Sequence, residues 1–183
     1  MYIICMELLS TIRGSIKTLS TLATMYNGAL AINNRFIVRK IVKFSEKELD
    51  EKVIQDYVNS IDIYHWEEIQ DAIIHQLTQA ESIVKAGYER NLVEALLTRK
   101  ITDADFWRMN FVLQHLYTLD IKDLVRLYNG GSCSEEKKKM FLLYGLLDDK
   151  GITKFENESM IIGQQQSSTN DFGKKFVEAI KDS

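Results

Sequence analysis

Few residue types in this chain of 183 residues could perform catalysis or hold a metal, since it has three histidines and two cysteines. One predicted helix carries polar side chains on a single face, namely Glu68, Asp71, His75 and Gln79. This spacing can supply two or three metal ligands, but it lacks the HExxH signature and a cysteine partner. We therefore interpret His75 as an ion-pairing surface residue. His115 adjoins aromatic residues, which favours a partly buried structural role.

Cys133 precedes a predicted helix N-terminus and three lysines, an arrangement that lowers the pKa of a thiol. A nucleophilic thiol also needs an oriented base and an oxyanion site, and no such pair is recognisable here. We therefore expect an inert loop cysteine, no cofactor, no metal and no enzymatic activity. Two cysteines are too few for a disulfide framework, and no secretory or spanning segment is recognised, so we expect a cytoplasmic protein.

Positive charge is concentrated near the N-terminus. Residues 1–44 hold six bases and one acid, whereas the remainder holds 25 acids and 17 bases. The stretch 34–44 predicts a basic amphipathic helix, whose bases are Arg35, Arg39, Lys40 and Lys43. Such a helix can contact an anionic membrane surface, nucleic acid or an acidic protein. Because the rest of the chain is acidic, we favour an ordinary surface helix whose bases pair with acids elsewhere in the chain.

Aromatic residues are numerous between residues 64 and 117, and most are expected in the core: Tyr64, Trp66, Tyr88, Phe106, Trp107, Phe111 and Tyr117. Tryptophan and tyrosine are also enriched at binding hot spots. Trp66, Trp107 and Phe111 are therefore our candidates for protein-interface anchors.

The absence of proline, together with nine glycines, favours helices joined by short loops. We expect a mainly α fold with a helical bundle over residues 1–118. A heptad pattern predicts a helix over 7–31, and a Ser45–Glu48 capping box predicts a second over 45–60. A long apolar stripe predicts a third over 66–87, and Thr102 caps a fourth over 103–117.

Residues 119–183 show a different pattern. A short helix over 120–128 ends at Asn129–Gly131, and Ser134 caps a second helix that continues to Leu147. Two short strands are predicted around the acidic turn 156–158, at 152–155 and 159–163. Thr169 or Asn170 caps a last helix.

The order of these predicted elements resembles that of a winged helix-turn-helix. The residues that carry the resemblance are Tyr144–Leu147, before the two predicted strands, and Thr169–Phe176, after them. The tail also resembles that of the Abi-alpha-like group of bacterial proteins. The resemblance implies a bacterial or phage protein that acts in phage defence, a prophage or a mobile element.

In a winged helix, the second helix would present Lys137, Lys138 and Lys139 as candidate contacts for an anionic partner. Acidic residues flank these lysines and occupy the predicted wing tip, which counts against strong binding to phosphates. Our leading hypothesis is therefore a non-enzymatic, macromolecule-binding protein that recognises a protein partner or itself. The alternatives are a winged-helix DNA-binding regulator and a membrane-peripheral protein that docks through residues 34–44.

Overall fold

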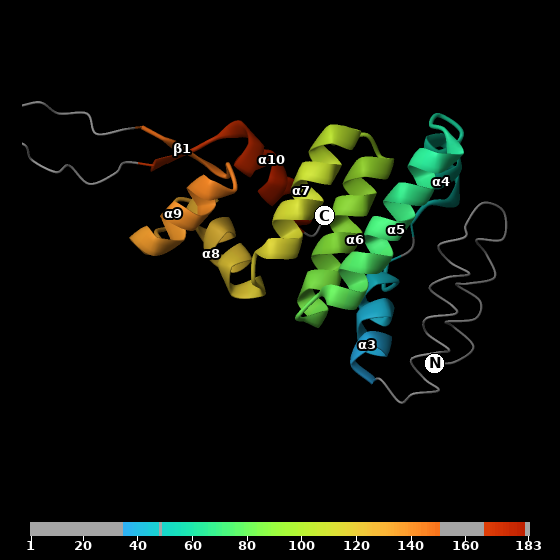
Figure 1. Ribbon diagram of the computed structural model, residues 1–183, viewed down its shortest axis with the longest axis horizontal. Coiled ribbons are helices and arrows are strands. Elements are labelled where there is room, and N and C mark those ends of the chain that lie inside the picture. Colours follow the sequence, from blue (N-terminus) through green and yellow to red (C-terminus); the bar gives the residue numbers. More distant parts are fainter. Residues whose placement is uncertain (1–34, 48, 151–166, 182–183) are drawn as a thin grey trace, which may run out of the picture. The chain divides into compact units, whose positions relative to one another are not determined.

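The computed structural model describes residues 35–47, 49–150 and 167–181. The protein is mainly helical, with a small antiparallel two-stranded sheet near the C-terminus, which confirms the predicted fold class (Figure 1). The predicted heptad helix 7–31 and the predicted strands 152–155 and 159–163 lie outside the described residues.

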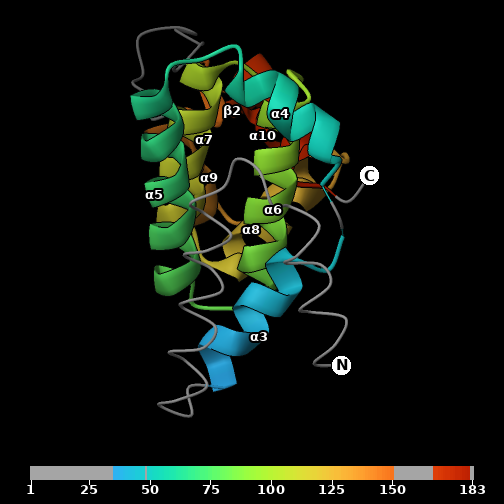
Figure 2. The same ribbon diagram turned by 90° about the vertical axis from the view of Figure 1, so that its right-hand side faces the viewer.

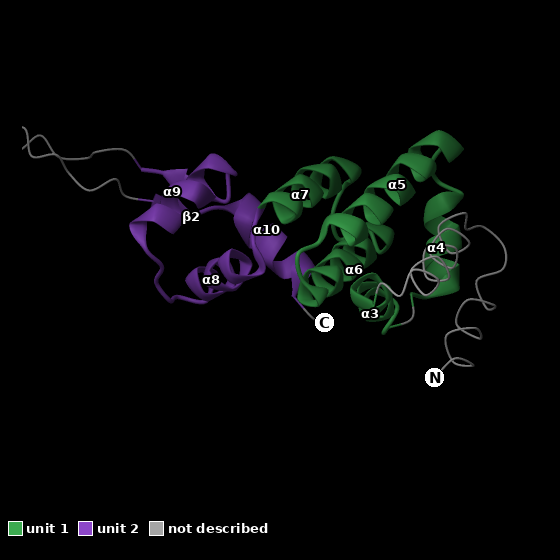
Figure 3. Cartoon of the chain, turned by 60° about the horizontal axis from the view of Figure 1, so that its bottom comes forward, with its two compact units in different colours: residues 1–115, 182–183 green, residues 116–181 purple. Residues whose placement is uncertain are grey.

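The chain divides into two compact units, the first ending at His115 and the second spanning Leu116–Lys181 (Figure 3). The sequence placed this boundary three residues later, after residue 118. The described helices of unit 1 are α3 (Arg35–Phe44), α4 (Glu51–Val58), α5 (Ile63–Gln79), α6 (Ile83–Leu97) and α7 (Asp103–His115).

Helices α4 to α7 each begin after a side-chain cap, but two of these starts differ from the prediction. The predicted helix start at Ser45 is wrong, because α3 ends at Phe44 and α4 begins at Glu51. There the Asp50 carboxylate accepts from the backbone N–H groups of Lys52 and Val53. The predicted helix 66–87 is divided at Ala80, and the Ser82 hydroxyl caps α6. The Thr102 cap is confirmed, since Thr102 and Asp105 exchange hydrogen bonds between side chain and backbone.

Helix α6 is the central element of unit 1. It packs against α3, α4, α5 and α7, and Figure 2 shows it among them. Ten of its fifteen residues are buried, and four of these are polar or charged: Lys85, Glu89, Arg90 and Asn91. Because neighbours cover most of this helix, its sequence shows no single apolar stripe.

Glu89 is the most deeply buried of these charged residues. Its side chain is fully covered, and neither carboxyl oxygen has a hydrogen-bond partner in the structure. Burial raises the pKa of Glu89 from 4.5 to about 8, against the opposing effect of nearby Lys85. At neutral pH the carboxyl is therefore largely protonated in the folded protein.

We predict that Glu89 makes the folded state less stable as the pH rises from about 4.5 to about 8. Over this range the unfolded carboxyl is ionised while the folded one retains its proton, so raising the pH favours unfolding. The Glu89→Gln variant lacks this penalty, and its advantage over the wild type should widen by at least about 1 kcal/mol between about pH 5 and about pH 8. Urea unfolding at both pH values measures this, with the exposed Glu178→Gln as control. An advantage that stays constant with pH would contradict the assignment.

Unit 2 contains α8 (Thr118–Tyr128), α9 (Glu135–Leu143), β1 (Leu147–Asp149), β2 (Ser167–Thr169) and α10 (Asp171–Ile180). The strands pair antiparallel, with Leu147 opposite Thr169 and Asp149 opposite Ser167. The predicted continuation of α9 to Leu147 is wrong, because the helix ends at Leu143 and β1 begins at Leu147. The caps at Ser134 and Asn170 are confirmed.

Tyr128 connects three elements of unit 2. Its hydroxyl donates to the Leu146 carbonyl before β1 and accepts from the Asn170 backbone N–H, at 3.1 Å, before α10. Gly173 in the first turn of α10 leaves room for this contact. A Cβ atom at Gly173 would lie 2.0 Å from the Tyr128 hydroxyl and 2.3 Å from the Leu146 carbonyl oxygen.

We predict that Gly173→Ala destabilises unit 2 by about 2 kcal/mol or more, because the methyl group collides with backbone that cannot easily shift. Far-ultraviolet circular dichroism during urea unfolding measures the loss. The exposed Lys174→Ala in the same helix is the control, and its effect should stay within about 0.5 kcal/mol. Equal stability of the two variants would show that unit 2 tolerates the added methyl group.

Candidate functional site

Two of the four bases of the basic helix α3 are exposed. Arg35 and Arg39 are exposed and have no acidic partner among the described residues. Lys43 is half-exposed and pairs with Glu46 just beyond the helix. The expected pairing of Arg35 and Arg39 with distant acids is therefore not seen in the described part of the chain.

Lys40 does not belong to the exposed basic surface, which corrects its assignment as a contact for an anionic partner. It is 1% exposed, and its Nζ atom donates to the carbonyl oxygens of Thr78 at 2.9 Å and Ala80 at 3.1 Å. These carbonyls lie at the C-terminal end of α5, where the helix dipole favours a cation. Burial lowers the pKa of Lys40.

The predicted apolar side of α3 is used for packing. Ile41 and Phe44 are buried, and α3 packs against α6 and α5. A helix that docks on lipid must bury its apolar face in the bilayer interface, and this face already lies in the protein core. The arrangement therefore weighs against membrane docking through α3, although Phe36 and Val42 remain partly exposed.

The lysines of α9 are largely compensated within unit 2. Lys137 pairs with Asp120 at 3.1 Å and with Asp123, and hydrogen bonding to these carboxylates raises the pKa of Lys137. Lys138 pairs with Glu135 at 2.6 Å, and Lys139 is exposed. Because DNA affinity depends largely on cations that neutralise phosphates, this pairing weighs against a DNA-reading helix.

The three candidate interface aromatics have different environments. Trp66 is 4% exposed and packs edge-on against Tyr57, with ring centroids 6.2 Å apart, so it belongs to the core and cannot contact a partner. Trp107 is half-buried and lies beside His65, with centroids 6.4 Å apart. Phe111 is 54% exposed and lies 4.2 Å from the His115 ring.

Helices α5 and α7 contact each other along their length. Contacts between His65 and Asp103, at 3.7 Å, and between His75 and Gln114, at 3.3 Å, join the two helices side by side. We call the exposed surface along this pair the α5–α7 face and define it by Tyr64, Glu68, Asp71, His75, Trp107 and Phe111. Tyr64, which was expected in the core, is 76% exposed.

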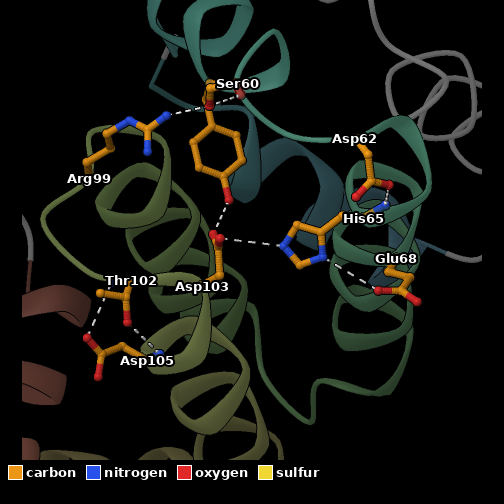
Figure 4. Close-up of polar contacts among 9 residues, drawn as sticks. Ser60, Asp62, His65, Glu68, Arg99, Thr102, Asp103 and Asp105 are labelled. Atoms are coloured by element: carbon orange, nitrogen blue, oxygen red, sulfur yellow. Dashed lines mark hydrogen bonds and ion pairs between the residues drawn. The ribbon is translucent and has the colours of Figure 1, made fainter.

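A polar network fixes one end of this face (Figure 4). The Tyr57 hydroxyl donates to Asp103, and burial together with this hydrogen bond raises the pKa of Tyr57. The other Asp103 oxygen lies 3.7 Å from His65 Nε2, and His65 Nδ1 lies 3.6 Å from Glu68. The network thus joins α4, α5 and α7.

Arg99 extends the network from the loop between α6 and α7. Its guanidinium donates to the Ser60 hydroxyl and lies 5.5 Å from the centroid of the Tyr57 ring. Its backbone φ is 56°, a left-handed conformation that glycine usually provides after a helix. The arginine at this position retains side-chain contacts that glycine would lose.

Sequence reasoning missed this network because Tyr57 and Asp103 are 46 residues apart. Only the i, i+3 spacing of His65 and Glu68 was visible, and Glu68 was assigned to a face with His75 instead.

The described residues contain no group of three histidine, cysteine or acidic residues arranged to hold a metal ion. The predicted lowering of the Cys133 pKa is wrong, because burial raises the pKa of this thiol more than Lys138 lowers it. No described helix is both long and apolar enough to cross a membrane.

Comparison of the chain with protein-family models, with curated proteins and with solved structures gave no match.

We predict that Lys40→Met destabilises unit 1 by about 1–3 kcal/mol, because the variant leaves the carbonyls of Thr78 and Ala80 without their donor. Lys43→Met is the matched control, since its ammonium forms only a surface ion pair, and it should change the unfolding free energy by less than about 0.5 kcal/mol. Tryptophan fluorescence during urea unfolding reports on unit 1, which contains both tryptophans. A Lys40→Met variant as stable as Lys43→Met would contradict the structural role of Lys40.

Proposed function

We propose that this chain is a non-enzymatic binding protein whose α5–α7 face contacts another protein. The observation that supports this proposal most directly is the exposure of two large aromatic side chains, Tyr64 and Phe111, on one pair of packed helices. Aromatic residues that sit beside charged ones on a rigid surface are typical of interface hot spots.

The surroundings of these rings favour a pre-organised surface. Trp107 lies between the exposed face and the core, where it contacts Phe106 with ring centroids 5.5 Å apart. The His65–Asp103 contact holds the first turns of α5 and α7 together, and the Tyr57–Asp103 hydrogen bond ties α4 to the same turn of α7. A surface that is already ordered loses little conformational entropy when a partner binds.

The charge of the face favours a basic partner. Glu68 and Asp71 are exposed on α5, and this helix contains no lysine or arginine. Electrostatic complementarity would therefore select a partner that presents cations beside apolar groups.

Two further parts of the proposal rest on other grounds. We propose a setting of phage–host conflict solely from the C-terminal resemblance to Abi-alpha-like proteins. The winged-helix-like unit 2 would act as a second protein-binding module, which the local pairing of Lys137 and Lys138 supports over DNA binding.

We predict that the double variant Tyr64→Ser/Phe111→Ser loses at least about tenfold of its captured partner, because hot-spot aromatics carry most of the binding free energy. Affinity purification of the full chain with quantitative mass spectrometry measures the loss. Val84→Ser is the control, since it removes an exposed apolar side chain of unit 1 that lies outside the α5–α7 face.

Retention of the partner by the Tyr64→Ser/Phe111→Ser variant would contradict the proposal. So would the absence of any partner above the level of an unrelated bait, or a turnover that depends on His75, His115 or Cys133.

A further inference from the structure

Two exposed helical stripes in unit 1 carry opposite charge. On α3, Arg35, Arg39 and Val42 follow the spacing i, i+4, i+7 and share one exposed face. On α5, Tyr64, Glu68 and Asp71 follow the same spacing on the α5–α7 face. The two stripes therefore have equal length, roughly 10 Å at a rise of about 1.5 Å per residue.

The charges of these stripes are not neutralised by each other within the chain. Arg35 and Arg39 have no acidic partner among the described residues, and Asp71 has no basic one. Within the described ranges Glu68 contacts only His65 by a charged group, and its side chain is 70% exposed. Exposed charges that have no partner in the described part of their own chain can pair with charges on a second chain.

An antiparallel alignment of the two stripes brings the two end pairs level and offsets the middle pair by one residue, which is about 1.5 Å along the helix axis. It places Arg39 opposite Glu68 and Arg35 opposite Asp71, and it leaves the apolar Val42 opposite Tyr64. A parallel alignment would place Val42 against the Asp71 carboxylate, which is less favourable because the charge would lose water without gaining a partner.

We propose that the α5–α7 face of one copy binds α3 of a second copy, with the two helices antiparallel. This inference rests on the proposed function of the α5–α7 face and names its partner as the chain itself. Two exposed ion pairs and one apolar contact make a weak, salt-sensitive association.

The oligomeric state of the full chain tests the proposal, measured by analytical ultracentrifugation over a range of concentrations. The wild type should associate reversibly, and added salt should weaken the association. Arg35→Glu/Arg39→Glu and Glu68→Arg/Asp71→Arg should each raise the Kd at least about tenfold, because each variant places like charges opposite one another. Lys52→Glu/Lys100→Glu changes the same amount of charge at exposed sites of unit 1 outside both stripes and should associate like the wild type.

Mixing the two charge-reversed variants gives a sharper test. In the mixture the acidic α3 of one variant faces the basic α5 of the other, and each variant also retains one native stripe. Association should therefore return to near the wild-type Kd. If Glu68→Arg/Asp71→Arg does not fold, the neutral Glu68→Gln/Asp71→Asn variant replaces it. This variant should weaken association, but less than charge reversal does.

Two results would overturn the inference. One is a wild-type chain that remains monomeric at all concentrations. If the α5–α7 face of that monomer binds a different protein, self-association is wrong and the proposed function still stands. The other is binding of the monomer to vesicles of phosphatidylcholine and phosphatidylserine that is lost only in Arg35→Glu/Arg39→Glu, which would assign α3 to an anionic lipid surface.

Discussion

The burial of α6 is the constraint on which the rest of unit 1 depends. A helix covered on most sides must satisfy its backbone internally and place its polar side chains at the boundaries between its neighbours. Lys85 reaches the backbone carbonyl of Gln114 on α7, and Arg90 pairs with Glu94 one turn along. Glu89 has neither a hydrogen bond nor an ion pair of this kind, and burial keeps its carboxyl group largely protonated in the core.

This central helix also explains why α3, α5 and α7 can present surfaces at all. Each uses its apolar side against α6, so its opposite side faces solvent in a fixed orientation. Lys40 attaches α3 to the C-terminal end of α5, and the Tyr57 and His65 contacts join α4 and α5 to the start of α7. Exposed residues such as Tyr64 and Phe111 are therefore held by helices that side-chain hydrogen bonds tie together at their ends.

Many helix starts could be predicted from the sequence, whereas few of the residues that lie on the surface could. The helix starts at Thr102, Ser134 and Asn170 were predictable because a cap depends on residues within one turn. Ser45 has the same local signal but begins no helix, since α3 ends beside it and Asp50 supplies the cap for α4. The exposure of Tyr64, the burial of Lys40 and the Tyr57–Asp103 hydrogen bond were not predictable, because each depends on helices distant in sequence.

The pairing of Asp149 with Ser167 has a practical consequence for protein engineering. Paired strand ends bring the chain back to the point from which it left, so the stretch between them starts and finishes at neighbouring positions of unit 2. The entropic cost of closing such a stretch grows only with the logarithm of its length. Asp149 and Ser167 therefore mark neighbouring positions between which an epitope tag or a small folded reporter can enter and leave unit 2, while the Tyr128 contacts that organise unit 2 are preserved.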